Sequence, residues 1–451
     1  MVRIANGQGF WGDWLEAPRR LVADGPVDYL VLDYLSEVTM SILEKQKRRD
    51  PDKGYATDAV DLAVSLLPRM LASGIKIVTN AGGVNPRACA RAILEKASAT
   101  GISGVSVAVV LGDDIFDRID EMLSRGIRFD EIETGRPIED IREDLLSAHV
   151  YLGGFPLADA LATGAQIVIA GRSTDTALTL APMIHEFAWS EQDWDRLAAG
   201  TIAGHIIECG AQCTGGNCSV DWQTIPDMAN IGFPVVEAHE SGDFVVSKHP
   251  GTGGRITLAS IKEQLLYELG DPAAYLTPDC RADFTSLALR DDGLDRVAVE
   301  GGRGGPCPPT LKTSITYAAG YQAVGTLVYS WPDAVQKARA AERMVRRRLD
   351  DLGLRFDDIQ AEVLGLDACH GPAAAPNPDP PEVQLRIGVR AADRAPVERF
   401  SREMIPLVLN GPPTATGFGD GRPRVRQVVA HHASLLPRDE ISTSVETFSL
   451  P

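Results

Sequence analysis

Residues 158–184, ADALATGAQIVIAGRSTDTALTLAPMI, decide the fold class of this chain. A helix-favouring segment rich in alanine and leucine ends at Gly164. The apolar run AQIVIA (165–170) follows, and after the Gly-Arg pair at 171–172 a second helical segment begins. A short β-branched run between two helical segments is typical of a βα unit in a parallel sheet.

The same rhythm occurs throughout the first half of the chain. Four earlier β-like runs are each followed by a segment with helical character: VRIANG (2–7), VDYLVLDYLS (27–36), IKIVTNAGG (75–83) and VSVAVVLGDD (105–114). Repeated βα units place parallel strands in one sheet, with helices packed on it. We therefore predict an α/β fold whose region 1–205 holds a mostly parallel sheet with flanking helices.

Two further regions follow from changes in composition. Glycine and proline become dense after the first region, which predicts a loop region over 206–319 that completes the site. Region 320–451 begins with a β-like run, a helix over 332–353 and a second β-like run. The Pro-rich loop 372–382 then leads to a further strand and helix. This order predicts an α+β subdomain that resembles a split βαβ sandwich.

Composition excludes several classes of function. The 451 residues carry a formal net charge of −18, which argues against a nucleic-acid-binding protein. No apolar run approaches the roughly 18 residues that a membrane span needs. The first residues lack the features of a signal peptide, so we expect a cytoplasmic protein. In a reducing compartment the seven cysteines are expected to be thiols or ligands rather than disulfides.

The stretch HIIECGAQCTGGNC (205–218) gathers several groups that can bind metals or react. Cys209, Cys213 and Cys218 lack the CxxC spacing of a zinc knuckle, so a metal would need His205 or Glu208 as its fourth ligand. A charge at Glu208 would raise the pKa of the Cys209 thiol, which disfavours a cysteine nucleophile. The alternative is that small thiols pack in a core. We predict a ligand-facing loop with no metal.

Three loops with paired glycines are candidates for binding an anion. NAGG (80–83), TGG (214–216) and GTGG (251–254) each come after a β-like run, and none matches a nucleotide-binding glycine motif. Successive backbone N–H groups in such loops can hold a phosphate, as in a CoA-like group, or a carboxylate. The alternative is a set of tight turns. The predicted anion-binding residues are Asn80, Gly82, Gly83, Arg172, Gly215, Gly216, Gly253 and Gly254.

Candidates for proton transfer lie near these loops. Arg172 and Asp175 follow a buried strand, where ligands bind in open α/β sheets. Arg172 suits recognition of a carboxylate or phosphate, and Asp175 can act as an acid or base or as a helix cap. Glu208 is a second candidate for proton transfer. Lys248 can stabilise an enolate, or it can be a solvated loop residue.

Several of these motifs occur in the order known from one protein family. They include NGQGFWGD (6–13), VTNAGGVNP (78–86), GRSTDTALTLAP (171–182), KHPGTGG (248–254) and GPPTATGFGDGRP (411–423). Over nearly the whole chain the sequence resembles the acyclic terpene utilisation family. The resemblance implies a role in isoprenoid catabolism, in a pathway that works on branched acyl-CoA esters.

The resemblance favours a lyase or hydratase that acts on a branched acyl-CoA or carboxylate, with CoA as part of the substrate. The alternatives are a non-catalytic binding subunit of a multi-protein complex and a Cys/His metal-dependent enzyme. NCSVD (217–221) stands where the family has an aromatic-rich stretch, so a different substrate is expected. Longer members carry a C-terminal ferredoxin-like region. We expect it here as a separate small subunit, and we expect an oligomer.

Overall fold

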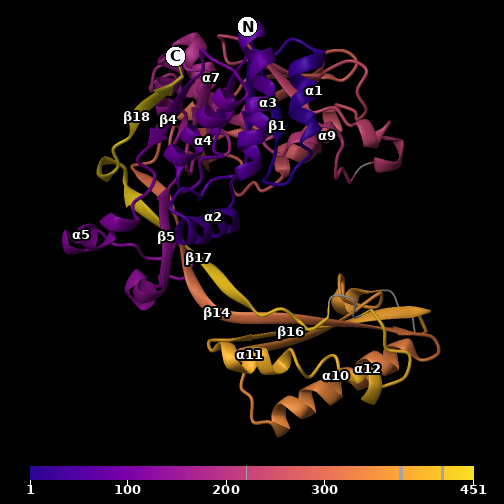
Figure 1. Cartoon of the computed structure of the whole chain (residues 1–451). Coiled ribbons are helices and arrows are strands. Elements are labelled where there is room, and N and C mark those ends of the chain that lie inside the picture. The colour runs from indigo at the N-terminus through magenta and orange to yellow at the C-terminus, as the bar shows by residue number, and fades with distance from the viewer. Residues whose placement is uncertain (220, 375–378, 418–420, 451) are drawn as a thin grey trace. The chain divides into compact units, whose positions relative to one another are not determined.

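The computed structural model describes residues 1–219, 221–374, 379–417 and 421–450 (Figure 1). The chain forms two compact units. The larger holds Met1–Thr316 and His431–Pro451, and the smaller holds Tyr317–Ala430. The predicted regions 1–205 and 206–319 thus belong almost entirely to one unit. The end of the chain returns to that unit, which the sequence did not indicate.

A ten-stranded sheet organises the larger unit, in the order β11-β12-β8-β7-β1-β2-β3-β6-β4-β18. Its five central strands pair in parallel, so the predicted mostly parallel α/β sheet is confirmed. They are β1 (Val2–Gln8), β2 (Tyr29–Leu32), β3 (Lys76–Thr79), β6 (Ile167–Ile169) and β4 (Ser106–Leu111). The antiparallel strands that extend the sheet are β7 (Pro234–Ala238), β8 (Phe244–Lys248), β12 (Arg296–Glu300), β11 (Ala288–Asp291) and β18 (Ser444–Ser449).

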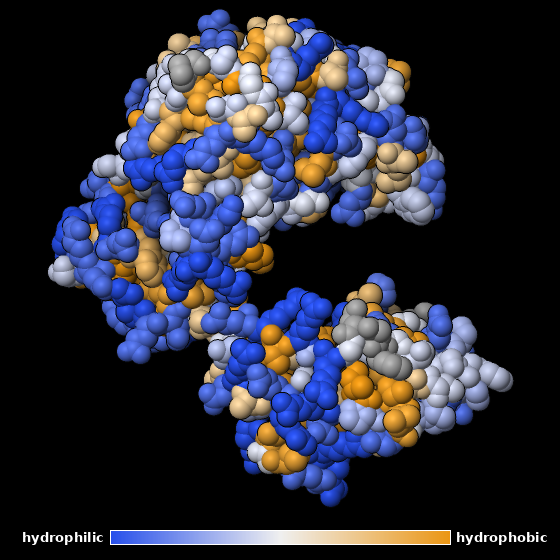
Figure 2. All heavy atoms as spheres, in the orientation of Figure 1, coloured by the Kyte–Doolittle hydropathy of each residue, from blue (hydrophilic) through white to orange (hydrophobic). Residues whose placement is uncertain are grey.

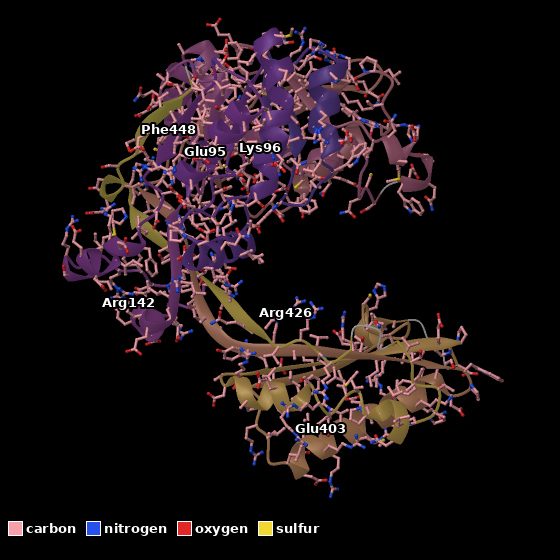
Figure 3. The ribbon with its side chains drawn as sticks, in the orientation of Figure 1. Glu95, Lys96, Arg142, Glu403, Arg426 and Phe448 are labelled. Atoms are coloured by element: carbon pink, nitrogen blue, oxygen red, sulfur yellow. The ribbon has the colours of Figure 1, made fainter. Side chains whose placement is uncertain are left out.

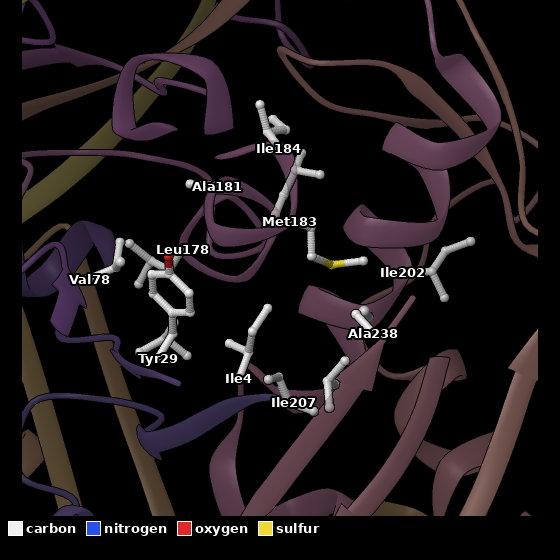
Figure 4. Close-up of a cluster of buried hydrophobic side chains, with 14 of the residues drawn as sticks. Ile4, Tyr29, Val78, Leu178, Ala181, Met183, Ile184, Ile202, Ile207 and Ala238 are labelled. Carbon is white, nitrogen blue, oxygen red and sulfur yellow. The ribbon is translucent and has the colours of Figure 1, made fainter. Parts of the chain in front are cut away.

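Helices cover both faces of this sheet because its strands carry apolar side chains on both faces. One core packs alternate strand residues, Ala5 and Leu30 among them, under α1 (Glu16–Asp24), α3 (Thr57–Ser73) and α4 (Pro86–Ala99). The opposite core packs Ile4 and Val78 under α6 (Gly154–Ala162), α7 (Ala177–Phe187) and α8 (Trp194–Ile207). Figure 4 shows this second core, to which Met183 of α7, Ile202 of α8 and Ile4 of β1 belong.

The connections reverse direction between β3 and β6. The chain leaves β3 toward α4 on one face of the sheet and leaves the adjacent β6 toward α7 on the other face. Such a reversal opens a crevice outside the carboxyl ends of the two strands, where ligands bind in open α/β sheets. Residues just after β3 and β6 therefore lie in the position that the fold favours for a site.

Among the described residues, none of the helices is both long and apolar enough to cross a membrane. Figure 2 shows hydrophilic residues over much of the visible surface of the larger unit, with hydrophobic residues between them.

The remaining elements of the larger unit are α2 (Glu37–Arg49), α5 (Ile119–Ser124), β5 (Leu145–Val150), α9 (Leu258–Leu266), β9 (Tyr275–Leu276), β10 (Arg281–Asp283) and β13 (Arg303–Gly305).

Apart from the four-residue helix α12, the smaller unit has the order β-α-β-β-α-β, which is the split βαβ arrangement that the sequence predicts. Its sheet has the strand order β15-β16-β14-β17, and the helix predicted over 332–353 is α10. Of the predicted Pro-rich loop 372–382, residues 375–378 lie outside the described residues. The elements wholly within the smaller unit are α10 (Ala334–Asp351), β15 (Asp358–Leu364), β16 (Glu382–Ala391), α11 (Arg394–Phe400) and α12 (Leu407–Asn410). β14 (Thr310–Ser330) begins in the larger unit and continues into the smaller one, and β17 (Arg426–Pro437) begins in the smaller unit and continues into the larger one.

Candidate functional site

Polar side chains gather where the central parallel strands end. Asp33 follows β2, Asn80 follows β3 and Arg172 follows β6, and all three are buried. The Asn80 amide nitrogen donates to Asp33 Oδ1 at 2.7 Å, and its oxygen accepts from the Tyr34 N–H at 2.8 Å. Parallel pairing of β2 with β3 places these residues side by side. Asn80 therefore fixes the position of the Asp33 carboxyl group.

Arg172 is buried against acidic and aromatic groups. Its side chain is 3% exposed, and Nη1 donates to the Leu35 carbonyl at 3.0 Å and to Asp175 Oδ1 at 3.2 Å. Nη2 lies 3.8 Å from Glu37 Oε1, and the guanidinium carbon lies 4.3 Å from the centre of the Tyr151 ring. A buried guanidinium with these neighbours stays charged and can recognise a carboxylate or phosphate.

Glu37 is the ionised partner of Arg172. Burial would raise the pKa of Glu37, but the hydrogen bond from the Tyr151 hydroxyl and the charge of Arg172 lower it to about 2. Glu37 begins α2 and Tyr151 follows β5, so two elements outside the main sheet supply this part of the site. Glu37 therefore balances the charge of Arg172 at neutral pH.

Asp175 behaves differently from Glu37, although both lie beside Arg172. Burial and the charge of Glu37 raise the pKa of Asp175, while the charge of Arg172 and its hydrogen bond lower it, and the net shift is upward. The side chain is nevertheless 41% exposed, so its carboxyl group reaches solvent. A partly exposed group with a raised pKa beside a fixed cation is suited to proton transfer.

Glu208 ends α8 and brings a third carboxyl group to the cluster. Burial raises the pKa of Glu208 well above its usual value, and the charges of Asp175 and Asp33 raise it further. The Asn6 amide nitrogen donates to the Glu208 backbone carbonyl at 2.8 Å, which ties the end of α8 to β1. Nearby His205 has its pKa lowered to about 4 by burial. Glu208 therefore holds its proton more tightly than an exposed glutamate does.

Asp33 completes the set. Burial and the charge of Asp175 raise its pKa to about 7, against the lowering effect of Asn80 and Arg172. Three carboxyl groups with raised pKa thus interact electrostatically with one buried guanidinium, which contacts Asp175 directly. We call Asp33, Arg172, Asp175 and Glu208 the carboxylate cluster. Like charges held close together cannot all ionise, so the cluster retains protons near neutral pH.

Unpartnered polar atoms at the same edge of the sheet point to a ligand or to bound water. Both amide atoms of Gln8, at the end of β1, are buried without a hydrogen-bond partner in the described structure. Arg172 Nε and the Ser173 hydroxyl are also buried without a hydrogen-bond partner in the described structure. Buried polar groups are nearly always hydrogen-bonded, so these atoms have capacity for a bound molecule.

Lys248 lies at the same edge but takes other partners. It ends β8, which runs in the same direction as β1 because each pairs antiparallel with β7. Its Nζ lies 3.1 Å from Asp295 Oδ2 and donates to the Thr252 carbonyl at 3.0 Å. A role for Lys248 in stabilising an enolate stays a prediction.

The glycine pairs allow close packing of the backbone. A Cβ atom on Gly82 would lie 2.6 Å from the Ala170 carbonyl oxygen, so the loops after β3 and β6 touch. A Cβ atom on Gly254 would lie 2.7 Å from the Thr214 carbonyl oxygen. The same oxygen accepts a hydrogen bond from the Arg255 N–H at 2.7 Å. The loops 214–216 and 251–254 therefore pack together. A single anion site shared by all three loops stays a prediction.

The remaining predicted anion-binding glycines lie in the same loops. Gly83 has a positive φ of 54°, and a Cβ there would come 2.3 Å from Leu43 of α2. Gly215 and Gly216 follow the short helical turn Gly210–Thr214, and a Cβ on Gly216 would lie 2.9 Å from the Ala211 carbonyl oxygen. Gly253 lies against the Asp227 carbonyl. Each glycine permits a backbone contact, and their role in binding an anion stays a prediction.

The cysteines of 205–218 are separated by the end of α8 and a short helical turn. Burial raises the pKa of Cys209 to about 12, and the charge of Glu208 adds to the effect. Cys213 is buried, and its thiol lies 3.6 Å from the Gly210 carbonyl oxygen. Within the described residues, no group of three or more His, Cys, Asp and Glu side chains could hold a metal ion.

Sequence reasoning missed Glu37, Tyr151 and Lys312. Lys312, on β14, lies 5.2 Å from the centre of the Tyr151 ring, and its charge lowers the pKa of Asp175. Glu37 and Lys312 lie beside no glycine pair, and Tyr151, two residues before the pair 153–154, follows β5 rather than a strand of the main sheet. A serine cap at Ser36 marks the start of α2, but this signal does not indicate that Glu37 reaches Arg172. Only the three-dimensional fold brings these residues to the cluster.

Comparisons with known proteins give one match. The profile of the acyclic terpene utilisation family protein AtuA matches residues 2–447. No curated protein and no solved structure matches the chain. Because the match covers nearly the whole chain, the protein belongs to the acyclic terpene utilisation family.

Proposed function

We propose that this protein is a lyase or hydratase that binds a branched acyl-CoA or carboxylate substrate at the carboxylate cluster. The observation that carries the proposal is the set of three carboxyl groups with raised pKa around buried Arg172, at the reversal between β3 and β6. Family membership supports a substrate from acyclic terpene catabolism.

The cluster can supply both partners of an elimination or addition. Arg172 holds a carboxylate or thioester oxygen of the substrate and stabilises the negative charge that develops there. Asp175, which is partly exposed, takes the proton from the carbon beside that carbonyl when it is in its carboxylate form. Protonated Glu208 or Asp33 gives a proton to the departing hydroxyl, so that an alkene and water leave. Hydration is the reverse of these steps.

Turnover of branched hydroxyacyl-CoA and enoyl-CoA esters tests the proposal. Asp175→Asn keeps the shape of the side chain and removes its charge, so we expect a loss of about 10²–10⁴-fold in kcat/KM. Glu208→Gln is expected to reduce turnover in the same way. Asp159→Asn is the matched control, because Asp159 is an exposed aspartate on α6.

Two results would count against the assignment. Turnover that persists within a few-fold in both Asp175→Asn and Glu208→Gln would show that these carboxyl groups do not transfer the proton. Tight binding of the esters without turnover would favour a non-catalytic binding subunit. That measurement is to be repeated with a separately produced ferredoxin-like subunit from the same pathway, and turnover that appears only then would indicate a divided enzyme.

A further inference from the structure

A buried histidine and aspartate form a pair outside the carboxylate cluster. His149 Nδ1 lies 3.0 Å from Asp113 Oδ2, and the two side chains are 2% and 5% exposed. His149 belongs to β5, and Asp113 follows β4. Hydrogen bonding of Nδ1 to a carboxylate orients the imidazole and leaves Nε2 as the atom that can meet a ligand.

The pair lines a cavity of about 240 Å³. Lys47 of α2 and the start of α4, residues 83–87, form its other walls, together with the loop 111–114. Typical small-molecule sites measure about 300–1,000 Å³, so this cavity suits a ligand of only a few heavy atoms or one group of a larger ligand. It also lies at the carboxyl ends of β3 and β4, the edge that the fold favours for binding.

The start of α4 adds donors without partners of their own. Asn85, the residue before the helix, caps no N–H group, because its amide nitrogen faces the carbonyls of Pro51 and Lys53 at 2.8 Å each. In the part of the chain that the structure describes, no side chain caps this 14-residue helix. Its first residue, Pro86, has no N–H, so the N–H groups of Arg87 and Ala88 together with the helix dipole favour an anion. Lys47 Nζ donates to the Val84 carbonyl at 2.9 Å and adds a positive charge to the wall.

We propose that this cavity is a second ligand site, which binds the phosphate or carboxylate group of a small anion between the start of α4, Lys47 and His149 Nε2. The proposal goes beyond the proposed function, because none of these residues belongs to the carboxylate cluster. Burial lowers the pKa of His149, but the hydrogen bond to Asp113 and the negative charges of Asp113, Asp114 and Glu44 raise it, and the net shift is upward. The ring is therefore suited to donate to an anion.

The site is also tied to the cluster through the backbone. Asp113 Oδ2 accepts from the Arg172 N–H at 2.8 Å as well as facing His149. A Cβ atom on Gly171 would come 2.3 Å from the same oxygen, so only glycine allows this approach. The Asp113 carboxylate thus holds the ring of His149 in place and fixes the start of the loop that carries Arg172 and Asp175.

Calorimetric titration of the full chain with inorganic phosphate and with malonate tests the site. We expect Lys47→Gln and His149→Gln to weaken the binding of at least one anion by tenfold or more. Lys45→Gln, on the same helix but outside the cavity wall, and His185→Gln are the controls, and they should change affinity less than twofold. A preference for phosphate or for malonate identifies the group that the site takes.

Because His149 is buried, its variant is checked by circular dichroism, and Lys47→Gln decides the question if His149→Gln does not fold. The proposal fails if the unmutated protein binds neither anion, or if Lys47→Gln binds as tightly as the unmutated protein. It also fails if Asp175→Asn, rather than Lys47→Gln, changes the affinity, because the anion then lies at the carboxylate cluster. None of these readouts depends on turnover of an acyl-CoA ester, so they are independent of the proposed function.

Discussion

Arginines of the two units are placed in opposite surroundings. In the larger unit Arg172 is 3% exposed and is enclosed by Glu37, Asp175 and the Tyr151 ring. In the smaller unit a cavity of about 450 Å³ is lined by arginines at 422, 424 and 426, and all three are exposed (Figure 3 labels Arg426). A buried cation forces its neighbours to shift their pKa, whereas an exposed one is solvated by water. Burial therefore supports the proposal that proton transfer takes place in the larger unit.

The two sheets explain this difference. Every residue of β2 is buried, because helices cover both faces of the parallel sheet. Along β16 buried residues alternate with more exposed ones, so that sheet has only one covered face. Polar groups at the end of a strand covered on both faces are cut off from water, and those on an open face are not.

Truncation of an apolar side chain should separate the two sheets most strongly. Leu30→Ala, in β2, removes a side chain that is 0% exposed and should cost about 2–5 kcal/mol of unfolding free energy. Val324→Ala, on the open face of β14, changes a residue that is 49% exposed. This substitution should change the unfolding free energy by about 0.5 kcal/mol or less. Guanidinium unfolding followed by circular dichroism measures both. Equal losses in the two variants would contradict the contrast.

Asp33 should contribute a measurable part of the pH dependence of stability. Its folded pKa is raised from 3.8 to about 7, so the folded state holds the proton more tightly than the unfolded state does. The protonated Asp33 carboxyl group therefore stabilises the folded state below pH 4, and this stabilisation is lost as the pH rises through 7. Asp33→Asn removes this titration, and the unfolding free energy of the unmutated protein relative to the variant should fall by the order of 4 kcal/mol between pH 4 and pH 8.

Calorimetric unfolding at several pH values measures this difference. The control is Asp61→Asn, because Asp61 is an exposed aspartate on α3 whose side chain is 68% exposed. Profiles of the unmutated protein and Asp33→Asn that run parallel across this range would show that Asp33 titrates at the same pH in both states.

The sequence predicts the architecture better than the site. The β-branched runs and the glycines after them mark the parallel strands, and strand ends such as Arg172 and Asp175 follow directly, so these two residues meet in the structure as expected. Glu37 and Tyr151 come from segments with no such pattern, because their contribution depends on how α2 and β5 pack. The raised pKa of Asp33 depends on burial, which a strand pattern alone does not quantify.

The smallest effect is expected at an ion pair on the open face of the smaller sheet. Arg386 of β16 lies opposite Glu362 of β15, and Arg386 Nε donates to Glu362 Oε2 at 2.6 Å. The side chains are 43% and 37% exposed, so water screens the attraction and each side chain loses freedom when the pair forms. A double-mutant cycle with Glu362→Gln and Arg386→Gln should give a coupling of about 0.2–1 kcal/mol.

Measuring the coupling at high salt extends this last test, because the Debye length falls to about 3 Å at 1 M and exposed charges are then screened from each other. The coupling should therefore shrink in 1 M NaCl, while the dependence of stability on Asp33 should persist, since water and salt do not reach a carboxyl group that is 5% exposed. A coupling above about 2 kcal/mol that salt does not reduce would be typical of a desolvated pair. The open face of β15 and β16 would then be covered in solution, and the contrast between the two sheets would have to be abandoned.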